Sequence, residues 1–169
     1  MMKLDDLNNA GAADFVALLD GTYEHSPWIA ERAAASRPFK SLAALKVALA
    51  RVVREASVDE QLGLIRAHPE LAGKAAIAKQ LTAESLGEQA SAGLDQLTPD
   101  EYARFQTLNS DYGAKFGFPF IICARLNDKT SILAAMQRRL AHDRDAEIAE
   151  AIAQIGLISR LRLEDAVAG

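Results

Sequence analysis

His68 directly precedes Pro69 and Glu70, and its side chain is the first feature of the sequence that could do chemistry. Proline disfavours helical geometry at the residue before it, so the helix expected through Leu62 and Ile65 must end near His68. An imidazole titrates close to neutrality and can serve as a general acid or base if it reaches a cleft. Alternatively, His68 only caps its helix by interacting with the C-terminal dipole.

A second polar group, formed by Ser85, Glu88 and Gln89, has the spacing of one helix face. Residues three and four positions apart are neighbours on a helix, so a hydroxyl, a carboxylate and a carboxamide would face one ligand. The small residues from Ala90 to Gly93 would permit close packing beside this stripe. The competing interpretation is a solvated helix face, since polar residues usually gather on the side away from the core.

The apolar run from Phe116 to Ala124 interrupts the helical pattern. It contains Pro119 and shows no alternation, which predicts a buried extended segment rather than a strand of a sheet. Core filling explains its composition, but its backbone N–H groups would need partners, and a planar heterocycle rich in carbonyls could supply them. Cys123 is expected to act as a small hydrophobic side chain, because no cationic neighbour would lower its pKa.

Two arginines near the C-terminus, Arg160 and Arg162, alternate with leucines, so at most one of them points inward. A guanidinium there would bind carboxylate or ureido groups in a bidentate manner. Other site chemistries find no support. The histidines His25, His68 and His142 lack metal-ligand spacing, and no nucleophile elbow, phosphate-binding loop or dinucleotide motif occurs. The residues therefore predict a polar cleft that holds no metal.

The elements that must position these residues are helices with recognisable start signals. The clearest signal is Thr98-Pro99-Asp100-Glu101, which combines an N-cap, a proline in the first turn and a capping-box glutamate. Ser57 with Glu60 forms a second capping box, and Ser41 and Thr82 are further N-caps. Helices are expected near residues 14–19, 27–33, 42–56, 58–68, 84–92, 99–116, 130–141 and 144–166, with Gly156 a possible kink or break. The patterns predict an all-α fold, a single compact helical domain spanning residues 1–169 with about seven to nine helices and one short extended buried segment.

Composition narrows the class of protein. Half of the 169 residues are hydrophobic and the net charge is −4, so the concentrated basic surface of a nucleic-acid binder is missing. No apolar stretch is long enough to span a membrane, and the N-terminus lacks the apolar core of a signal peptide. One cysteine excludes an internal disulfide framework. A cytoplasmic protein is expected.

In their order and spacing, the motifs resemble the family of 2-oxo-4-hydroxy-4-carboxy-5-ureidoimidazoline (OHCU) decarboxylases. The motifs that carry the resemblance are Arg37-Pro38-Phe39, residues 66–73, residues 82–85 with Glu88-Gln89, Ala92-Gly93-Leu94, Leu108-Asn109 with Tyr112, residues 115–125 and Arg162-Leu163. The resemblance extends over nearly the whole chain. Each motif alone is weakly specific, whereas the ordered set is strongly so.

The resemblance implies an all-helical homodimer without metal or organic cofactor, which releases CO₂ from OHCU to give (S)-allantoin, the last of three steps from urate. It implies that His68 is the catalytic acid, with Glu88 beside it and Arg162 entering the same pocket. The residues expected to bind substrate are Pro69, Ser85, Gln89, Phe120, Ile121, Ile122, Cys123 and Ala124. Two alternatives remain: a metal-free hydrolase that uses Ser85, His68 and Glu88, and a helical interaction module without enzymatic activity.

Overall fold

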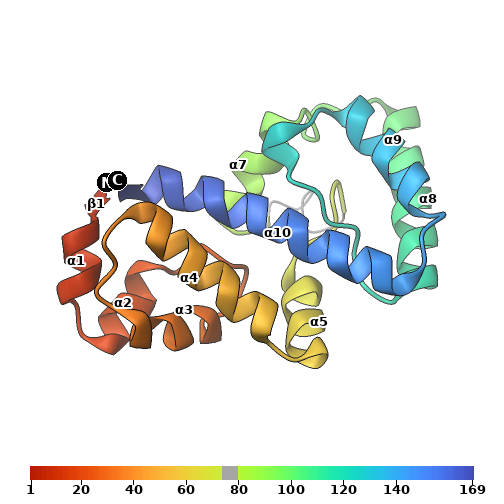
Figure 1. Cartoon of the computed structure of the whole chain (residues 1–169). Helices are drawn as coiled ribbons and strands as arrows, with labels where there is room; N and C mark the ends of the chain where they lie inside the picture. Colours follow the sequence, from red (N-terminus) through yellow and green to blue (C-terminus); the bar gives the residue numbers. More distant parts are fainter. Residues whose placement is uncertain (74–79) are drawn as a thin grey trace. The chain divides into compact units, whose positions relative to one another are not determined.

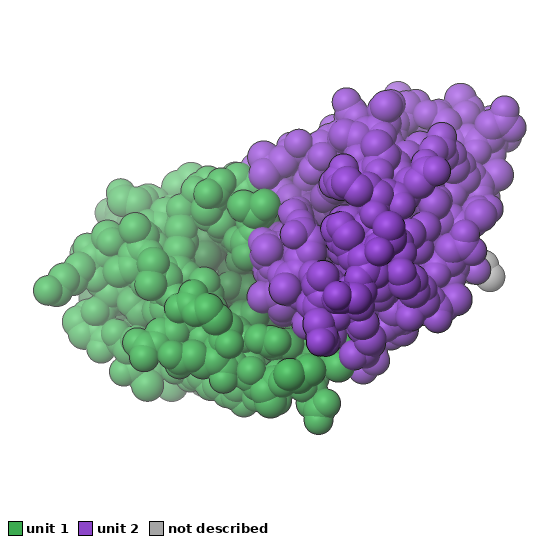
Figure 2. Space-filling model, turned by 45° about the vertical axis from the view of Figure 1, so that its right-hand side comes forward, with its two compact units in different colours: residues 1–64, 156–169 green, residues 65–155 purple. Residues whose placement is uncertain are grey.

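The computed structural model describes residues 1–73 and 80–169, which form two compact units. Unit 1 contains residues 1–64 and 156–169, and unit 2 contains residues 65–155 (Figure 2). Helices dominate both units, so the predicted all-α class is confirmed. That one domain spans residues 1–169 stays a prediction. Within the described ranges, no helix is both long and apolar enough to cross a membrane.

Unit 1 is built mostly from short helices of the first third of the chain (Figure 1). In chain order its elements are β1 (Met2–Lys3), α1 (Leu4–Asn9), α2 (Ala12–Leu18), α3 (Trp28–Ala33), the 3₁₀ helix η1 (Ala34–Ser36) and α4 (Leu42–Glu55). Helix α5 (Val58–Ala67) begins in unit 1 and ends in unit 2. Helix α10 (Arg144–Ala166) begins in unit 2 and ends in unit 1, where β2 (Val167–Ala168) follows. Strands β1 and β2 pair in parallel, so the two ends of the chain lie side by side.

The helix starts of unit 1 follow the predicted capping signals. Ser41 Oγ accepts a hydrogen bond from the N–H of Ala44 at 3.1 Å. Ser57 and Glu60 form the reciprocal pair of a capping box, each side chain accepting from the other's backbone N–H at 3.1 Å. Helix α1 was not predicted, because its six residues bury only one side chain, that of Leu7, and so show little periodicity.

Unit 2 contains α7 (Ala83–Ser91), α8 (Pro99–Phe116), the 3₁₀ helix η2 (Ala124–Leu126), α9 (Lys129–Arg139) and the first part of α10. The predicted capping box starts α8: Thr98 Oγ1 accepts from Glu101 N–H at 3.2 Å, and Glu101 Oε1 accepts from Thr98 N–H at 3.0 Å. Gly117, with φ 76°, ends the same helix in the left-handed conformation that glycine adopts readily. Helix α10 continues through Gly156.

A cluster of aromatic rings packs the end of α8 against the segment that follows it. The ring centroid of Tyr112 lies 4.5 Å from that of Phe116 and 5.4 Å from that of Phe120. Phe118 stacks on Phe116 at 5.9 Å. Between α8 and η2 the chain forms neither helix nor strand, and most of its side chains are buried, as predicted for the extended segment.

Candidate active site

His68 lies immediately after α5, at the position that the following proline predicts. Its backbone N–H donates to the carbonyl of Ile65 at 3.2 Å, which tightens the last turn of the helix. Only 7% of the residue is exposed, so the imidazole is in the interior and not in bulk water. The neighbouring Arg66 donates from Nε to the carbonyl of Gly117 at 3.2 Å, which ties this helix end to the end of α8.

Three side-chain amides hold the backbone of the loop that follows His68. Gln89 on α7 accepts from the N–H of Ala72 at 3.0 Å through Oε1 and donates to the carbonyl of Glu70 at 3.3 Å through Nε2. From α8, Asn109 Nδ2 donates to the carbonyl of Leu71 at 2.8 Å. Gln106 Nε2 donates to the carbonyl of Ala72 at 2.9 Å. The loop is therefore fixed by two helices.

Sequence reasoning did not assign these roles to Gln106 and Asn109. A signal was present for Asn109, which lies among the apolar residues Phe105, Leu108 and Tyr112 on the buried face of α8. A polar residue on such a face requires a hydrogen-bonding partner in the interior. Its partner is a loop carbonyl, which periodicity alone does not identify.

The polar stripe on α7 is largely buried. Thr82 Oγ1 caps the helix by accepting from the N–H of Ser85 at 3.2 Å, as predicted. Ser85 and Gln89 are both buried, and Glu88 is half-buried. The interpretation of the stripe as a solvated face is therefore wrong for Ser85 and Gln89. The loop uses one lone pair of the Gln89 oxygen and one of its two N–H groups.

The extended segment obtains hydrogen bonds from side chains of α9 and α10. The N–H of Cys123 donates to Gln154 Oε1 at 2.9 Å, and the carbonyl of Ile121 accepts from Arg139 Nη1 at 2.7 Å. Phe120, Ile121, Ile122, Cys123 and Ala124 are all buried. The need of this backbone for partners, expected from its extended shape, is thus met in part by the protein itself.

Cys123 lies close enough to α7 to sense the charge of Glu88. Burial raises the pKa of the Cys123 thiol, and the Glu88 carboxylate raises that pKa further. Arg125 lowers the thiol pKa, contrary to the expectation that no cation would, but burial outweighs it. Helix α7 also packs against η2, which directly follows Cys123. The thiol therefore stays protonated and acts as a small hydrophobic group, as predicted.

Within unit 2 the structure connects three parts of the predicted site. Gln89 joins the His68 loop to α7, and Glu88 with η2 joins α7 to the extended segment. A cavity of about 440 Å³ lies beside α7 in this unit. Gln89 is the member of the predicted site that lines it, together with apolar residues such as Leu86, Ala90 and Leu94.

Arg162 belongs to unit 1 and is held by an ion pair there. Its Nη2 donates to Glu24 Oε1 at 2.9 Å, and its Nη1 donates to the carbonyl of Gly21 at 3.0 Å. The side chain is 5% exposed, whereas that of Arg160 is 50% exposed, so one of the two arginines points inward, as expected. That Arg162 enters the pocket of His68 stays a prediction.

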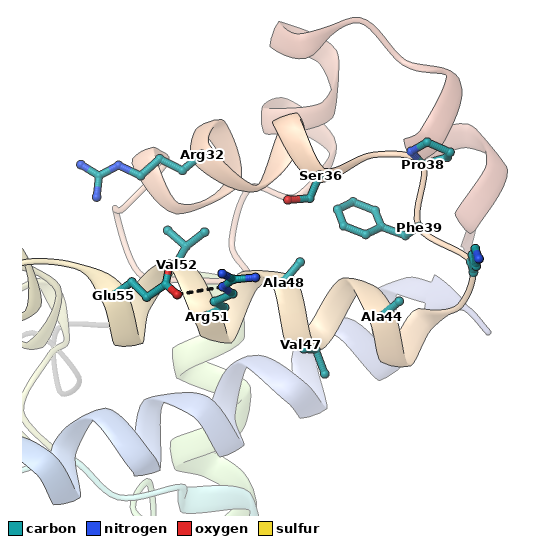
Figure 3. A pocket seen from close by; sticks show the side chains of 11 residues that line it. Arg32, Ser36, Pro38, Phe39, Ala44, Val47, Ala48, Arg51, Val52 and Glu55 are labelled. Atoms are coloured by element: carbon teal, nitrogen blue, oxygen red, sulfur yellow. Dashed lines mark hydrogen bonds and ion pairs between the residues drawn. The ribbon is translucent and has the colours of Figure 1, made fainter.

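A further hollow of about 830 Å³ lies in unit 1 between α3 and α4 (Figure 3). Phe39 and Val52 are among its lining residues. Two of its charged residues, Arg51 and Glu55, pair with each other through Nε and Oε1 at 2.8 Å, and Arg32 contacts Glu60. None of the predicted site residues lines this hollow.

Solved structures share the fold described above. A crystal structure of (S)-allantoin synthase aligns with a TM-score of 0.78 and 29% identity, over 99% of this chain and 54% of that one. A crystal structure of OHCU decarboxylase in the presence of (S)-allantoin aligns with a TM-score of 0.69 and 22% identity, over 83% of this chain and 91% of that one, which shows a shared fold. The chain thus shares its helical fold with solved structures of enzymes.

The family follows from the sequence comparisons. The OHCU decarboxylase family model matches residues 8–164, and the chain belongs to this family. A relative from Halalkalicoccus jeotgali named 2-oxo-4-hydroxy-4-carboxy-5-ureidoimidazoline decarboxylase is 43% identical over 97% of this chain and 91% of its own length. A relative of the same name from Haloferax volcanii is 41% identical over 97% of this chain and 95% of its own length.

Proposed function

We propose that this protein removes CO₂ from 2-oxo-4-hydroxy-4-carboxy-5-ureidoimidazoline and forms (S)-allantoin, the final step of urate degradation to allantoin. The observation that carries the proposal is the match of the family model to residues 8–164. Within these residues, His68 is buried, and the loop that follows it is held by α7 and α8. The relatives from Halalkalicoccus jeotgali and Haloferax volcanii bear the name of this decarboxylase.

The reaction breaks the bond between the carboxylate and the ring carbon that also carries the hydroxyl, and CO₂ leaves. The electron pair forms a double bond to the neighbouring ureido-bearing carbon, and the imine nitrogen of the ring takes up a proton. Protonated His68 then delivers a proton to the ureido-bearing carbon from one side, which sets the S configuration, while the hydroxyl loses its proton and becomes the ring carbonyl. General acid help of this kind contributes on the order of 10²–10⁴ in rate. A nearby Glu88 carboxylate favours the charged imidazolium.

The remaining residues bind and orient the substrate. Pro69 shapes the turn that presents His68. Ser85 and Gln89 offer a buried hydroxyl and a buried carboxamide. The backbone of residues 120–124 meets the carbonyl and amide edges of the ring. Arg162 contacts a ring or ureido carbonyl, because tight binding of the departing carboxylate would stabilise the ground state and would not accelerate the chemical step.

The role proposed for Ser85 is binding rather than nucleophilic attack. Ser85 lies within the first turn of α7 and is buried. The nucleophilic serine of a nucleophile elbow is instead exposed at a strained turn between a strand and a helix. The hydrolase alternative, with Ser85, His68 and Glu88 as a triad, therefore gains no support from the local geometry.

The decisive test uses OHCU freshly generated from urate by the two preceding enzymes, with the circular dichroism of allantoin as the readout. Wild-type protein should give rapid, optically active product, whereas a sample without protein should give racemic allantoin. The His68→Ala variant should fold but yield racemic product at the uncatalysed rate. Optically active allantoin from His68→Ala would remove the histidine from its role, and an inert wild-type protein would refute the activity itself.

We further propose that the protein acts as a homodimer in the cytoplasm, as its resemblance to the family implies. Light scattering on a size-exclusion column should give twice the mass of the chain at assay concentrations. A monomer with full activity would contradict the dimer.

A further inference from the structure

A buried network of polar side chains connects α8, α9 and α10 in unit 2. Glu147 Oε1 accepts hydrogen bonds from the Tyr112 hydroxyl at 2.5 Å and from Arg139 Nε at 2.8 Å. Its other oxygen, Oε2, lies 2.9 Å from Nδ1 of the half-exposed His142. Tyr112, Arg139 and Glu147 are at most 2% exposed. Burial and the Glu147 carboxylate raise the pKa of the Tyr112 phenol well above its usual range, so the hydroxyl remains a donor.

Arg139 contacts two consecutive residues of the extended segment. Its Nη1 donates to the carbonyl of Ile121 at 2.7 Å, and its guanidinium carbon lies 4.2 Å from the centroid of the Phe120 ring. Tyr112 contacts the same ring edge-on at 5.4 Å. The two side chains that donate to Glu147 Oε1 therefore both contact Phe120, from two different helices.

These contacts fix the orientation of a peptide plane. A peptide bond is planar, and in the trans form its N–H points opposite to its C=O. Because Arg139 binds the carbonyl of Ile121, the N–H of Ile122 must point away from Arg139. The next plane is fixed from α10, where Gln154 accepts from the N–H of Cys123. Arg139 therefore sets the direction of the Ile122 N–H, and Gln154 sets the direction of the Ile122 carbonyl.

Stability alone is a poor reason for such a network. Removing two charges from water is costly, and a buried ion pair is often no more stabilising than apolar side chains of similar volume. The planar guanidinium does what an apolar side chain would not, since it binds a carboxylate and a carbonyl at once while stacking on a ring.

We infer that Arg139 and Glu147 are positioning residues, which hold the backbone of residues 120–124 in the orientation that binds the substrate. This inference rests on the proposed function and names residues that act on the same site from outside it. Glu147 orients Arg139, and Arg139 orients the peptide between Ile121 and Ile122. Neither residue is required to touch the substrate.

The experiment compares Arg139→Lys with Arg138→Lys. Lysine at 139 keeps the positive charge next to Glu147, but a single ammonium cannot reproduce the planar fork or the stacking on Phe120. Arg138 is an exposed neighbour on the same helix, so its variant is a matched control. For Arg139→Lys we expect KM for OHCU to rise roughly tenfold or more, the effect of losing a charge-assisted hydrogen bond, with kcat within about threefold of wild type. Arg138→Lys should leave both constants unchanged.

A merely structural role would lower the folded fraction and hence the apparent kcat, but would leave KM unchanged. A folded Arg139→Lys variant with the wild-type KM therefore overturns the inference, as does a loss confined to kcat. If Arg139→Lys does not fold, the double variant Arg139→Met with Glu147→Gln removes both charges and should show the same rise in KM. Failure of both variants to fold would assign the network to stability and would also overturn the inference. Inactive wild-type protein would instead refute the proposed function.

Discussion

Replacing Gln89 with leucine should release the loop that carries His68, while the volume of the side chain hardly changes. The amide of Gln89 makes two hydrogen bonds to this loop, to the N–H of Ala72 and to the carbonyl of Glu70. Leucine can make neither. Ala72 is buried, so its N–H would lose its partner away from solvent.

The expected magnitude follows from these two bonds. A buried donor without a partner costs about 1–3 kcal/mol, and the loss of the second hydrogen bond costs about 1 kcal/mol, partly offset by burial of the apolar leucine. We expect the free energy of unfolding to fall by about 2 kcal/mol, which corresponds to a decrease in Tm of roughly 4–8 °C for a chain of this length. Because catalysis depends on sub-ångström placement of the acid, kcat/KM should fall on the order of tenfold to hundredfold.

Urea denaturation followed by far-UV circular dichroism measures the change in stability, and the allantoin assay measures activity. The matched control is Gln96→Leu, the same chemical change at an exposed position, for which a change within about 0.5 kcal/mol is expected. If Gln89→Leu is as stable and as active as wild type, the loop does not depend on this amide, and the reasoning fails.

Three further predictions concern other charged or titrating groups. Glu24→Gln removes the carboxylate that pairs with the buried Arg162, so urea denaturation should show a loss of about 3 kcal/mol in the free energy of unfolding. The Arg32 guanidinium lowers the pKa of Glu60 to about 2, so this carboxylate stabilises the protein above its usual pKa of 4.5 and the contribution is lost as the pH falls from 4.5 toward 2. The stability difference between wild type and Glu60→Gln should therefore vanish over that interval, and a constant difference would contradict the pairing. The Cys123 thiol is buried and its pKa is raised, so a thiol reagent at neutral pH should label it only after unfolding. Rapid labelling of the native protein would instead show that the thiol is accessible.

Signals that act over a few residues predicted much of the fold. The capping boxes at Ser57 and Thr98 need only a hydroxyl and a carboxylate three positions apart, and both mark true helix starts. The proline after His68 likewise placed the histidine at a helix end. The residues of the site came from the family motifs, which encode an arrangement that periodicity does not, and their roles stay predictions.

Features that depend on contacts between distant segments were not predictable in the same way. The stripe of Ser85 and Gln89 has the pattern of a solvated face, and only the packing of α7 in unit 2 buries it. Arg139 and Glu147 lie on different helices, separated by a turn, so no helical spacing relates them. The partners of Gln106 and Asn109 are carbonyls of a loop, and any residue type can supply a carbonyl.

Ala72, in the loop behind His68, has a φ of 54°, a left-handed conformation that alanine adopts only at a cost of about 1–2 kcal/mol. Its N–H and its carbonyl are both held by side chains, Gln89 and Gln106, so two helices impose this shape on the chain. If either helix frays, Ala72 is expected to leave the left-handed conformation, and the loop then no longer positions the His68 imidazole. Heat inactivation should therefore precede global melting, with catalysis fading several degrees below the temperature at which the helices unfold.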